Sequence, residues 1–187
     1  MKHQGTKMLE SDRLILRRFV MDDAQAIYDN WASDSEVTKF LMWPTHENVE
    51  ATRKILSDWT SQYYKDDFYI WAITIKENGD SPVGSISVVD KDDRIKMVHI
   101  GYCIGRQWWN QGMISEAFGL TISYLFNEVQ VNRIATRHDP RNPASGKVMQ
   151  KCGLKYEGMQ READWNNQGI CDASMYAILA KDYNGGA

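Results

Sequence analysis

The stretch RQWWNQGMISEA, residues 106–117, joins a segment of strand character to a segment of helical character through one glycine. Branched and apolar residues precede it at 95–105, and apolar residues at helical spacing follow it at 115–128. Gly112 lies in the turn just before the helix, where glycine permits a positive φ and a close approach of the backbone to another group. The sequence therefore predicts a tight strand-to-helix connection at Gly112.

The backbone amides of residues 111–115 would point outward at the start of the predicted helix. Free N–H groups and the helix dipole attract anions at such a terminus, which predicts a cradle for phosphate or pyrophosphate. The stretch lacks the GK[ST] of a P-loop and the repeated glycines of a dinucleotide fingerprint. Taken alone, the feature favours a plain turn about two to one over an anion site.

The rest of the chain alternates strand and helix patterns. The predicted order is strand 13–18, helix 21–32, helix 48–65, strands 69–76, 83–89 and 95–105, helix 115–128, strand 133–138, helix 142–153, and strands 154–159 and 172–180. The three consecutive strands with polar turns predict an antiparallel meander. This order predicts one α+β (mixed α/β) domain over residues 9–183, with flexible ends at 1–8 and 184–187.

The helix predicted at 142–153 carries end signals of its own. Asn142 suits the N-cap, Pro143 the first helical position and Gly153 the C-terminal stop. After it, a polar loop joins the two closing strands and contains Trp165, Asn166, Asn167 and Gly169.

Composition restricts the class of protein. The chain has 187 residues, enough for one domain with its own core, and its net charge of −3 gives no general attraction to nucleic acid or an anionic membrane. Cys103, Cys152 and Cys171 are odd in number and far apart, which argues against disulfides or a metal site and for a reducing compartment. Since it has no apolar run of membrane-spanning length and no secretory pattern, we expect a cytoplasmic protein.

Four stretches together resemble the GNAT superfamily of acyl-CoA-dependent N-acyltransferases, and within it the Rim-type ribosomal-protein alanine N-acetyltransferases. They are ESDRLILRRFVMDDAQAIYDNWASDSEVTKFL (10–41), IGYCIGRQWWNQGMISEA (100–117), NRIATRHDPRNPASGKVMQKCGLKYEG (132–158) and CDASMYAILAKDY (171–183). The resemblance implies a single domain built on a mixed sheet that is splayed at the acetyl-CoA site. It also implies direct transfer of an acetyl group from acetyl-CoA to a primary amine, without a metal.

The family's pyrophosphate loop has the pattern [RQ]-x-x-G-x-[GA]. In this sequence it falls on Trp109, Asn110, Gln111, Gly112, Met113 and Ile114, followed by Ser115, which are the implied cofactor-binding residues. Gly112 matches the central glycine, and Trp109 replaces the first residue, as is common in the Rim-like group. Ile114 replaces the final small residue, and we expect its branched side chain to crowd the backbone where phosphate approaches.

The resemblance places the pantetheine arm of acetyl-CoA between two parallel strands, 95–104 and 133–138, that diverge. Backbone groups of Tyr102, Cys103 and Ile104 would bond this arm. One of their N–H groups would polarise the thioester carbonyl and stabilise the oxyanion as the amine attacks.

Asn142 and Ser145 match the N-x-x-S of the group in the stretch NPAS. The resemblance implies that Asn142 contacts the CoA arm and that Ser145 is the general acid for the leaving thiolate. A structural interpretation is also complete, because Asn142 caps the helix and Ser145 suits its third position. CoA thiolate is a fairly good leaving group, which reduces the need for an acid.

A general base would remove the proton of the acceptor ammonium, and two residues are candidates. His99 stands before IGY, where many members carry Glu, and imidazole has a suitable intrinsic pKa. Asp164 lies in the loop where the alanine N-acetyltransferases carry a carboxylate base. Each has a structural alternative, a bonded strand histidine or a solvated loop charge. We interpret Glu157 as structural.

The acceptor side of this family lies between the first two helices, where this chain offers Phe40, Met42, Trp43 and His46, with Trp165 from the later loop. Such an aromatic pocket suits a short peptide terminus, including that of a ribosomal protein, or a small hydrophobic amine. An acetyl-CoA-binding sensor without efficient catalysis and a non-CoA nucleotide binder remain open, as does a monomer or a homodimer.

Overall fold

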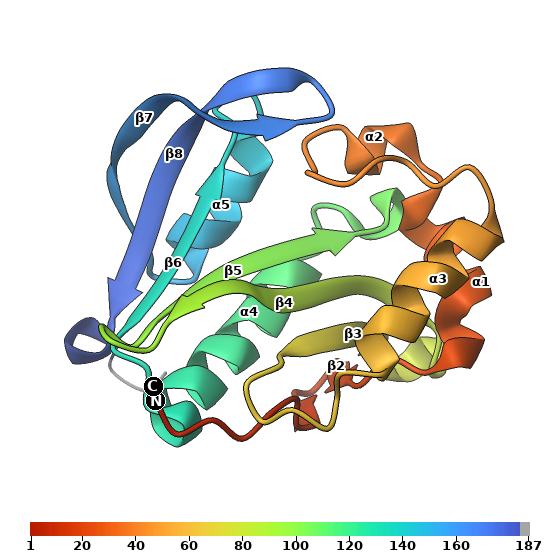
Figure 1. Cartoon of the computed structure of the whole chain (residues 1–187), viewed down its shortest axis with the longest axis horizontal. Helices are drawn as coiled ribbons and strands as arrows, with labels where there is room; N and C mark the ends of the chain where they lie inside the picture. The colour runs from red at the N-terminus through yellow and green to blue at the C-terminus, as the bar shows by residue number, and fades with distance from the viewer. Residues whose placement is uncertain (184–187) are drawn as a thin grey trace.

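The computed structural model describes residues 1–183 and shows one mixed sheet with helices on both faces (Figure 1). The strands are β1 (Leu9–Glu10), β2 (Leu14–Arg17), β3 (Ile70–Ile75), β4 (Pro82–Asp92), β5 (Met97–Ile104), β6 (Arg133–His138), β7 (Lys155–Asn166) and β8 (Gly169–Leu179). The α-helices are α1 (Ala24–Ile27), α2 (Ser35–Thr38), α3 (Val49–Thr60), α4 (Met113–Tyr124) and α5 (Pro143–Lys151). π-helical turns extend α1 over Tyr28–Ala32 and α4 over Leu125–Val129.

The strand order is β1-β2-β3-β4-β5-β6-β8-β7, and every neighbouring pair is antiparallel except β5 and β6. This confirms the predicted single α+β domain and its antiparallel meander. Two short elements, β1 and α2, were not predicted. The predicted tail at 184–187 lies outside the described residues.

Strand β3 lies at the centre of the packing. Trp71 and Ile73 are fully buried in the cluster that includes α4, whereas Ile70 and Ala72 are buried in the cluster that includes α1 and α3. Successive side chains of a strand point to opposite faces, so a strand covered on both faces has a continuous apolar run.

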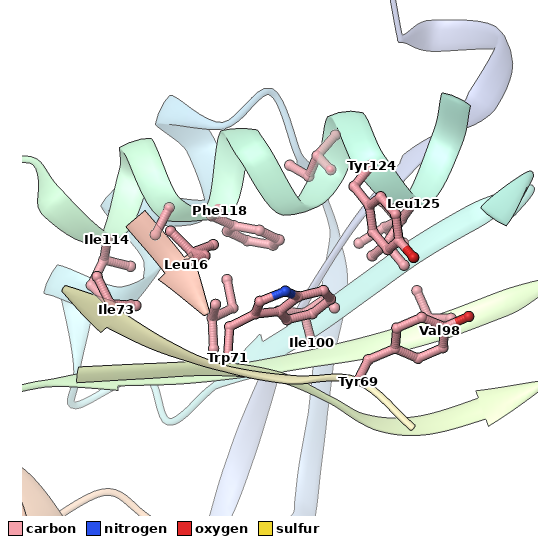
Figure 2. Close-up of a cluster of buried hydrophobic side chains, with 14 of the residues drawn as sticks. Leu16, Tyr69, Trp71, Ile73, Val98, Ile100, Ile114, Phe118, Tyr124 and Leu125 are labelled. Atoms are coloured by element: carbon pink, nitrogen blue, oxygen red, sulfur yellow. The ribbon is translucent and has the colours of Figure 1, made fainter. Parts of the chain in front are cut away.

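Helix α4 packs along the other side of this strand (Figure 2). Ile114 and Phe118 point from the helix toward the sheet, where Leu16, Trp71 and Ile73 lie. All five side chains are no more than 7% exposed. The apolar contact fixes the helix against the sheet and thereby fixes the position of the loop before it.

The parallel strands β5 and β6 pair over only three residues, Met97–His99 with Arg133–Ala135. Beyond this point the hydroxyl of Thr136 donates to the carbonyl of Ile100 at 2.9 Å. The strands then diverge, as Figure 1 shows, although β5 continues to Ile104 and β6 to His138. The sheet is therefore splayed at its centre, as the resemblance implied.

The closing strands are longer than predicted. β7 and β8 form one hairpin whose connection is only residues 167–168, so Trp165 and Asn166 belong to the strand and not to a loop. β7 is an edge strand, and most of its side chains are exposed on both faces. Alternation of polar and apolar residues is lost in such a strand, which explains why its sequence resembles a loop.

Residues 1–8, for which the sequence predicted a flexible end, are hydrogen-bonded to the domain at several points. The amide of Lys2 donates to Val129 O at 2.7 Å. The hydroxyl of Thr6 donates to Phe68 O at 3.0 Å and accepts from the amide of Ile70 at 3.1 Å. Thr6 is 2% exposed, so these bonds replace contacts with water.

Thr6→Val should lower the free energy of unfolding by about 1–3 kcal/mol, because it leaves a buried amide and a buried carbonyl without partners at nearly unchanged volume. Urea unfolding followed by circular dichroism measures this. Thr6→Ser keeps the hydroxyl and should retain most of the stability. An unchanged midpoint in the valine variant would show that the hydroxyl does not anchor the segment.

Candidate functional site

The turn before α4 has the predicted backbone conformation. Gly112 is the N-cap of α4 with φ 77°, and Asn110 also has a positive φ of 60°. Met113 and Ile114 follow in the first turn of the helix, and both side chains are buried. The expectation that Ile114 crowds the phosphate approach is wrong, because this side chain points into the core and away from the loop (Figure 2).

Two cationic side chains lie beside this helix start. A Cβ built on Gly112 would lie 3.7 Å from Nη2 of Arg13 and 3.7 Å from Nζ of Lys151. Arg13 also pairs with Glu116 and donates to the carbonyl of Gln111 at 3.3 Å. A helix N-terminus without a side-chain cap, flanked by two cations, fits a phosphate group. Sequence reasoning missed both cations because they are distant in the chain.

The backbone hydrogen-bonding groups of β5 alternate between its two neighbours. The amide of Gly105 donates to Val83 O of the β4 side at 2.9 Å, while the carbonyl of Ile100 accepts from Thr136 of β6. Odd-numbered residues therefore direct their backbone toward β4, and even-numbered residues direct it toward β6.

In the splayed part, this alternation places the backbone of Tyr102 and Ile104 toward the gap. The backbone N–H and C=O of Cys103 point toward β4 and not toward the gap, where the prediction placed them. The indole of Trp109 donates to the carbonyl of Ile104 at 2.9 Å and occupies that acceptor. The amides of Tyr102 and Ile104 and the carbonyl of Tyr102 are left as the groups that face the gap.

A cavity of about 790 Å³ opens beside the gap and gathers most of the predicted site. Its lining includes Phe40, Met42, Trp43, His46, His99, Tyr102, Cys103, Asn142, Ser145, Asp164 and Trp165. Residues 109–115 do not line it. The predicted acceptor and catalytic residues therefore share one cavity, and the predicted pyrophosphate loop lies apart from it.

Ser145 lies at the start of α5 and touches β5 through its hydroxyl. The Tyr102 hydroxyl lies 2.9 Å from Ser145 Oγ and donates to Ser145 O at 3.1 Å. Burial raises the pKa of Tyr102, so the phenol keeps its proton at neutral pH. Asn142 Oδ1 accepts from the Ser145 amide at 3.4 Å, which confirms the predicted cap. Sequence reasoning singled out the backbone of Tyr102 but not this hydroxyl.

Arg137 lies between the two predicted bases, and sequence reasoning did not single it out. Its guanidinium bonds both oxygens of Asp164, at 2.5 and 3.2 Å. Its Nη1 lies 3.4 Å from Nε2 of His99. Both predicted bases are therefore engaged by the same cation. RIATRH predicts only a strand, and the partners of Arg137 lie in other parts of the chain.

His99 is 9% exposed, and this burial together with the charge of Arg137 lowers its pKa to about 4. An imidazole with this pKa is neutral at pH 7 and takes a proton weakly. The geometry therefore argues against His99 as the general base. Glu157 pairs with Arg133 at 2.8 Å, in keeping with the structural role expected for it.

The tip of the β7–β8 hairpin lies beside the segment that contains α2 (Figure 1). The side-chain amide of Asn167 donates to Thr38 O and to Trp43 O, both at 2.8 Å. Its backbone amide donates to Leu41 O at 3.2 Å. One asparagine thus ties the hairpin to the segment that carries Phe40, Met42 and Trp43.

A family model described as the acetyltransferase (GNAT) domain matches residues 13–155. The chain belongs to the GNAT acetyltransferase family. The match spans β2 to the start of β7 and therefore contains the splayed strands, the loop at Gly112 and α5.

Relatives and solved structures agree with this assignment. The chain is 28% identical over 177 residues to the uncharacterized N-acetyltransferase p20 of Bacillus licheniformis, covering 95% of this chain and 98% of that protein. It is 27% identical over 140 residues to the ribosomal-protein-serine acetyltransferase of Escherichia coli, covering 74% and 76%. A structure of the ribosomal L7/L12 alpha-N-protein acetyltransferase RimL in complex with coenzyme A aligns with TM-score 0.82 and 20% identity, covering 92% and 98%, and shows the shared fold.

Within residues 1–183, this GNAT acetyltransferase has no group of acidic, histidine or cysteine side chains arranged to hold a metal ion. Cys103, Cys152 and Cys171 are free thiols. Over the same residues, each helix is too short or too polar to cross a membrane.

The buried His99 makes the stability of this acetyltransferase sensitive to acid. The unfolded chain binds a proton near pH 6.5 and the folded chain only near pH 4, so the free energy of unfolding falls as pH falls through this window. At pH 4.5, His99 accounts for a loss of roughly 2–3 kcal/mol relative to pH 7.

His99→Gln, which cannot take this proton, should lose less stability than the wild type between these two pH values. Urea unfolding at pH 7 and 4.5 measures the difference. Equal losses in the two proteins would show that the His99 pKa is not lowered by folding.

Proposed function

We propose that this GNAT acetyltransferase transfers an acetyl group from acetyl-CoA to the primary amine of an acceptor, with the N-terminal amine of a protein such as a ribosomal protein as the first candidate. The observation that carries the proposal is the gap between β5 and β6, which has an uncapped helix N-terminus at Gly112 on one side and the aromatic cavity on the other.

The residues present fit acetyl-CoA. The first-turn amides of α4 with Arg13 and Lys151 would hold the pyrophosphate, and the backbone of Tyr102 and Ile104 would bond the amides of the arm. Asn142 lies beside the cavity and is available to the same arm. Bound acetyl-CoA would supply an acetyl group activated as a thioester.

The protein groups favour direct attack by the amine over an acyl-enzyme. Cys103 faces the cavity, but burial raises its pKa to about 11, so its nucleophilic thiolate is scarce at neutral pH. A backbone amide in the gap would stabilise the oxyanion. As the C–S bond breaks, Ser145, which is hydrogen-bonded to Tyr102, would give its proton to the departing sulfur and regain one from the attacking nitrogen.

The acceptor is proposed from the relatives and from the cavity. Two of the compared proteins carry names of ribosomal-protein acetyltransferases, and both are distant. A small hydrophobic amine is the second candidate, because Phe40, Trp43 and Trp165 give the cavity an aromatic lining.

Calorimetric titration should give micromolar binding of acetyl-CoA and none of ATP or NAD. Gly112→Val should weaken acetyl-CoA binding at least tenfold, because a branched side chain disfavours the positive φ that presents the amides of α4. Turnover with alanine- and serine-ended peptides and with small amines then identifies the acceptor. Binding without turnover on any amine would favour a sensor.

Gly79→Val is the matched control for this titration. Gly79 has a similar φ of 73° with no atoms within 4 Å of an added Cβ, and it lies in the turn between β3 and β4. Its ψ of −160° lies in a region that is essentially restricted to glycine, so this variant carries at least as much backbone strain as Gly112→Val and should still bind acetyl-CoA as the wild type does. Unchanged affinity for acetyl-CoA in a folded Gly112→Val variant would contradict the proposal that this loop binds the pyrophosphate.

Ser145→Ala should lower kcat about tenfold without changing the Kd for acetyl-CoA, because it removes a proton donor and leaves the helix start intact. Tyr102→Phe should have a similar effect if the phenol holds this hydroxyl in place. Ser145→Thr retains a hydroxyl and should keep most of the rate. An unaltered kcat in Ser145→Ala would show that Ser145 has only a structural role at the start of α5.

A further inference from the structure

The charged side chains of the cavity suggest which form of the amine it accepts. Two of its lining residues are carboxylates, and each is paired with an arginine. Asp164 is bonded through both oxygens by Arg137. Asp139 is bonded by Arg141 at 2.6 Å and by the buried amide of Asn166 at 2.9 Å. Arg141 lowers the pKa of Asp139, which therefore stays ionised and paired.

The other titratable side chains that line the cavity add no negative charge near Phe40, Met42 and Trp43. One of them, Lys54 of α3, is a cation. Burial lowers the pKa of His46, whose Nδ1 lies 2.8 Å from the Thr52 hydroxyl. His99 is neutral, and Arg137 occupies its Nε2. The groups that face His99 are Arg137 and Arg133 from β6, Asp90 from β4 and Asp164 from β7.

An ammonium entering this cavity would lose hydration without gaining an unpaired carboxylate. Moving a cation from water into an apolar site is costly unless an opposite charge is free to pair with it. Asp164, at 15% side-chain exposure, is the carboxylate bonded to the same arginine that contacts His99, and its charge is already balanced. A neutral amine avoids this cost and already carries the lone pair needed for attack.

We infer that the acceptor enters as the neutral amine and that Arg137, by balancing Asp164, is the residue that excludes the ammonium. The inference rests on the proposed acetyl transfer. It favours amines of low basicity, such as an amine beside an amide carbonyl, over alkyl amines. At pH 7 about a tenth of an amine with pKa near 8 is neutral, against less than a thousandth of an alkyl amine with pKa near 10.4.

The test compares two acceptors of similar shape, phenylalaninamide and phenethylamine, which differ by the carboxamide that lowers the basicity of the amine. In the wild type with coenzyme A present, the association constant for phenethylamine, measured by calorimetry, should rise about tenfold per pH unit between about pH 6.5 and 8.5, because only the neutral amine binds. With phenylalaninamide the rise should level off near pH 8, where its own amine becomes neutral. A flat profile for phenethylamine in this window would show that the ammonium binds and would overturn the inference.

Arg137→Gln leaves Asp164 free to pair with the ammonium, so the phenethylamine profile should rise less than about threefold over the same window. Arg137→Gln combined with Asp164→Asn removes both charges and should restore the steep rise. Arg137→Lys keeps the cation and should behave as the wild type does. A steep profile in all four proteins would show that Arg137 has no part in the selection.

A different result would contradict the proposed function itself. If the wild type binds acetyl-CoA but forms no acetylated product with either amine or with an alanine-ended peptide, acetyl transfer to amines is contradicted. Product from either amine supports the transfer, and the pH profile of amine binding then decides the inference.

Discussion

The site depends on the early end of the pairing between β5 and β6. Strands inside a sheet normally satisfy each other's backbone groups, and leaving them unpaired in the interior is costly. Here the chain closes the two ends of the opening with side chains. Thr136 bonds the carbonyl of Ile100 where the strands part, and Trp109 bonds the carbonyl of Ile104 at the far end. Between them, the carbonyl of Tyr102 and the amides of Tyr102 and Ile104 face the gap, where the proposed function places the amides of the acetyl-CoA arm.

Contacts beneath the sheet keep this opening from closing. The Tyr102 ring packs 5.6 Å from that of Phe118 on α4, and its hydroxyl bonds Ser145 on α5. The thiol of Cys152 on α5 bonds the carbonyl of Ser115 on α4 at 3.4 Å. The two helices and the strand therefore form one unit, so the cradle at Gly112 and the hydroxyl of Ser145 have a fixed spacing.

The parts of the structure that local sequence determines were predictable. Gly112 before a helix, and Asn142 with Pro143 at the start of another, are signals that need only neighbouring residues. The order of strands and helices followed from apolar periodicity, and the splay followed from the family resemblance. Periodicity failed where burial does not alternate, as in β7, and along residues 1–8, which are held by hydrogen bonds more than by an apolar face.

The charges of the site could not be predicted in the same way, because their partners are brought together only by the sheet. Arg137 lies two residues beyond Ala135, the last residue of β6 that pairs with β5, while Asp164 lies on the hairpin and His99 on β5. In the sequence the three residues are far apart, and only His99 and Asp164 are candidates for a base. In the folded chain the arginine changes their chemistry, since it balances the carboxylate and helps to keep the imidazole neutral. A residue's role in such a cavity depends on the net charge of the cluster more than on its own intrinsic pKa.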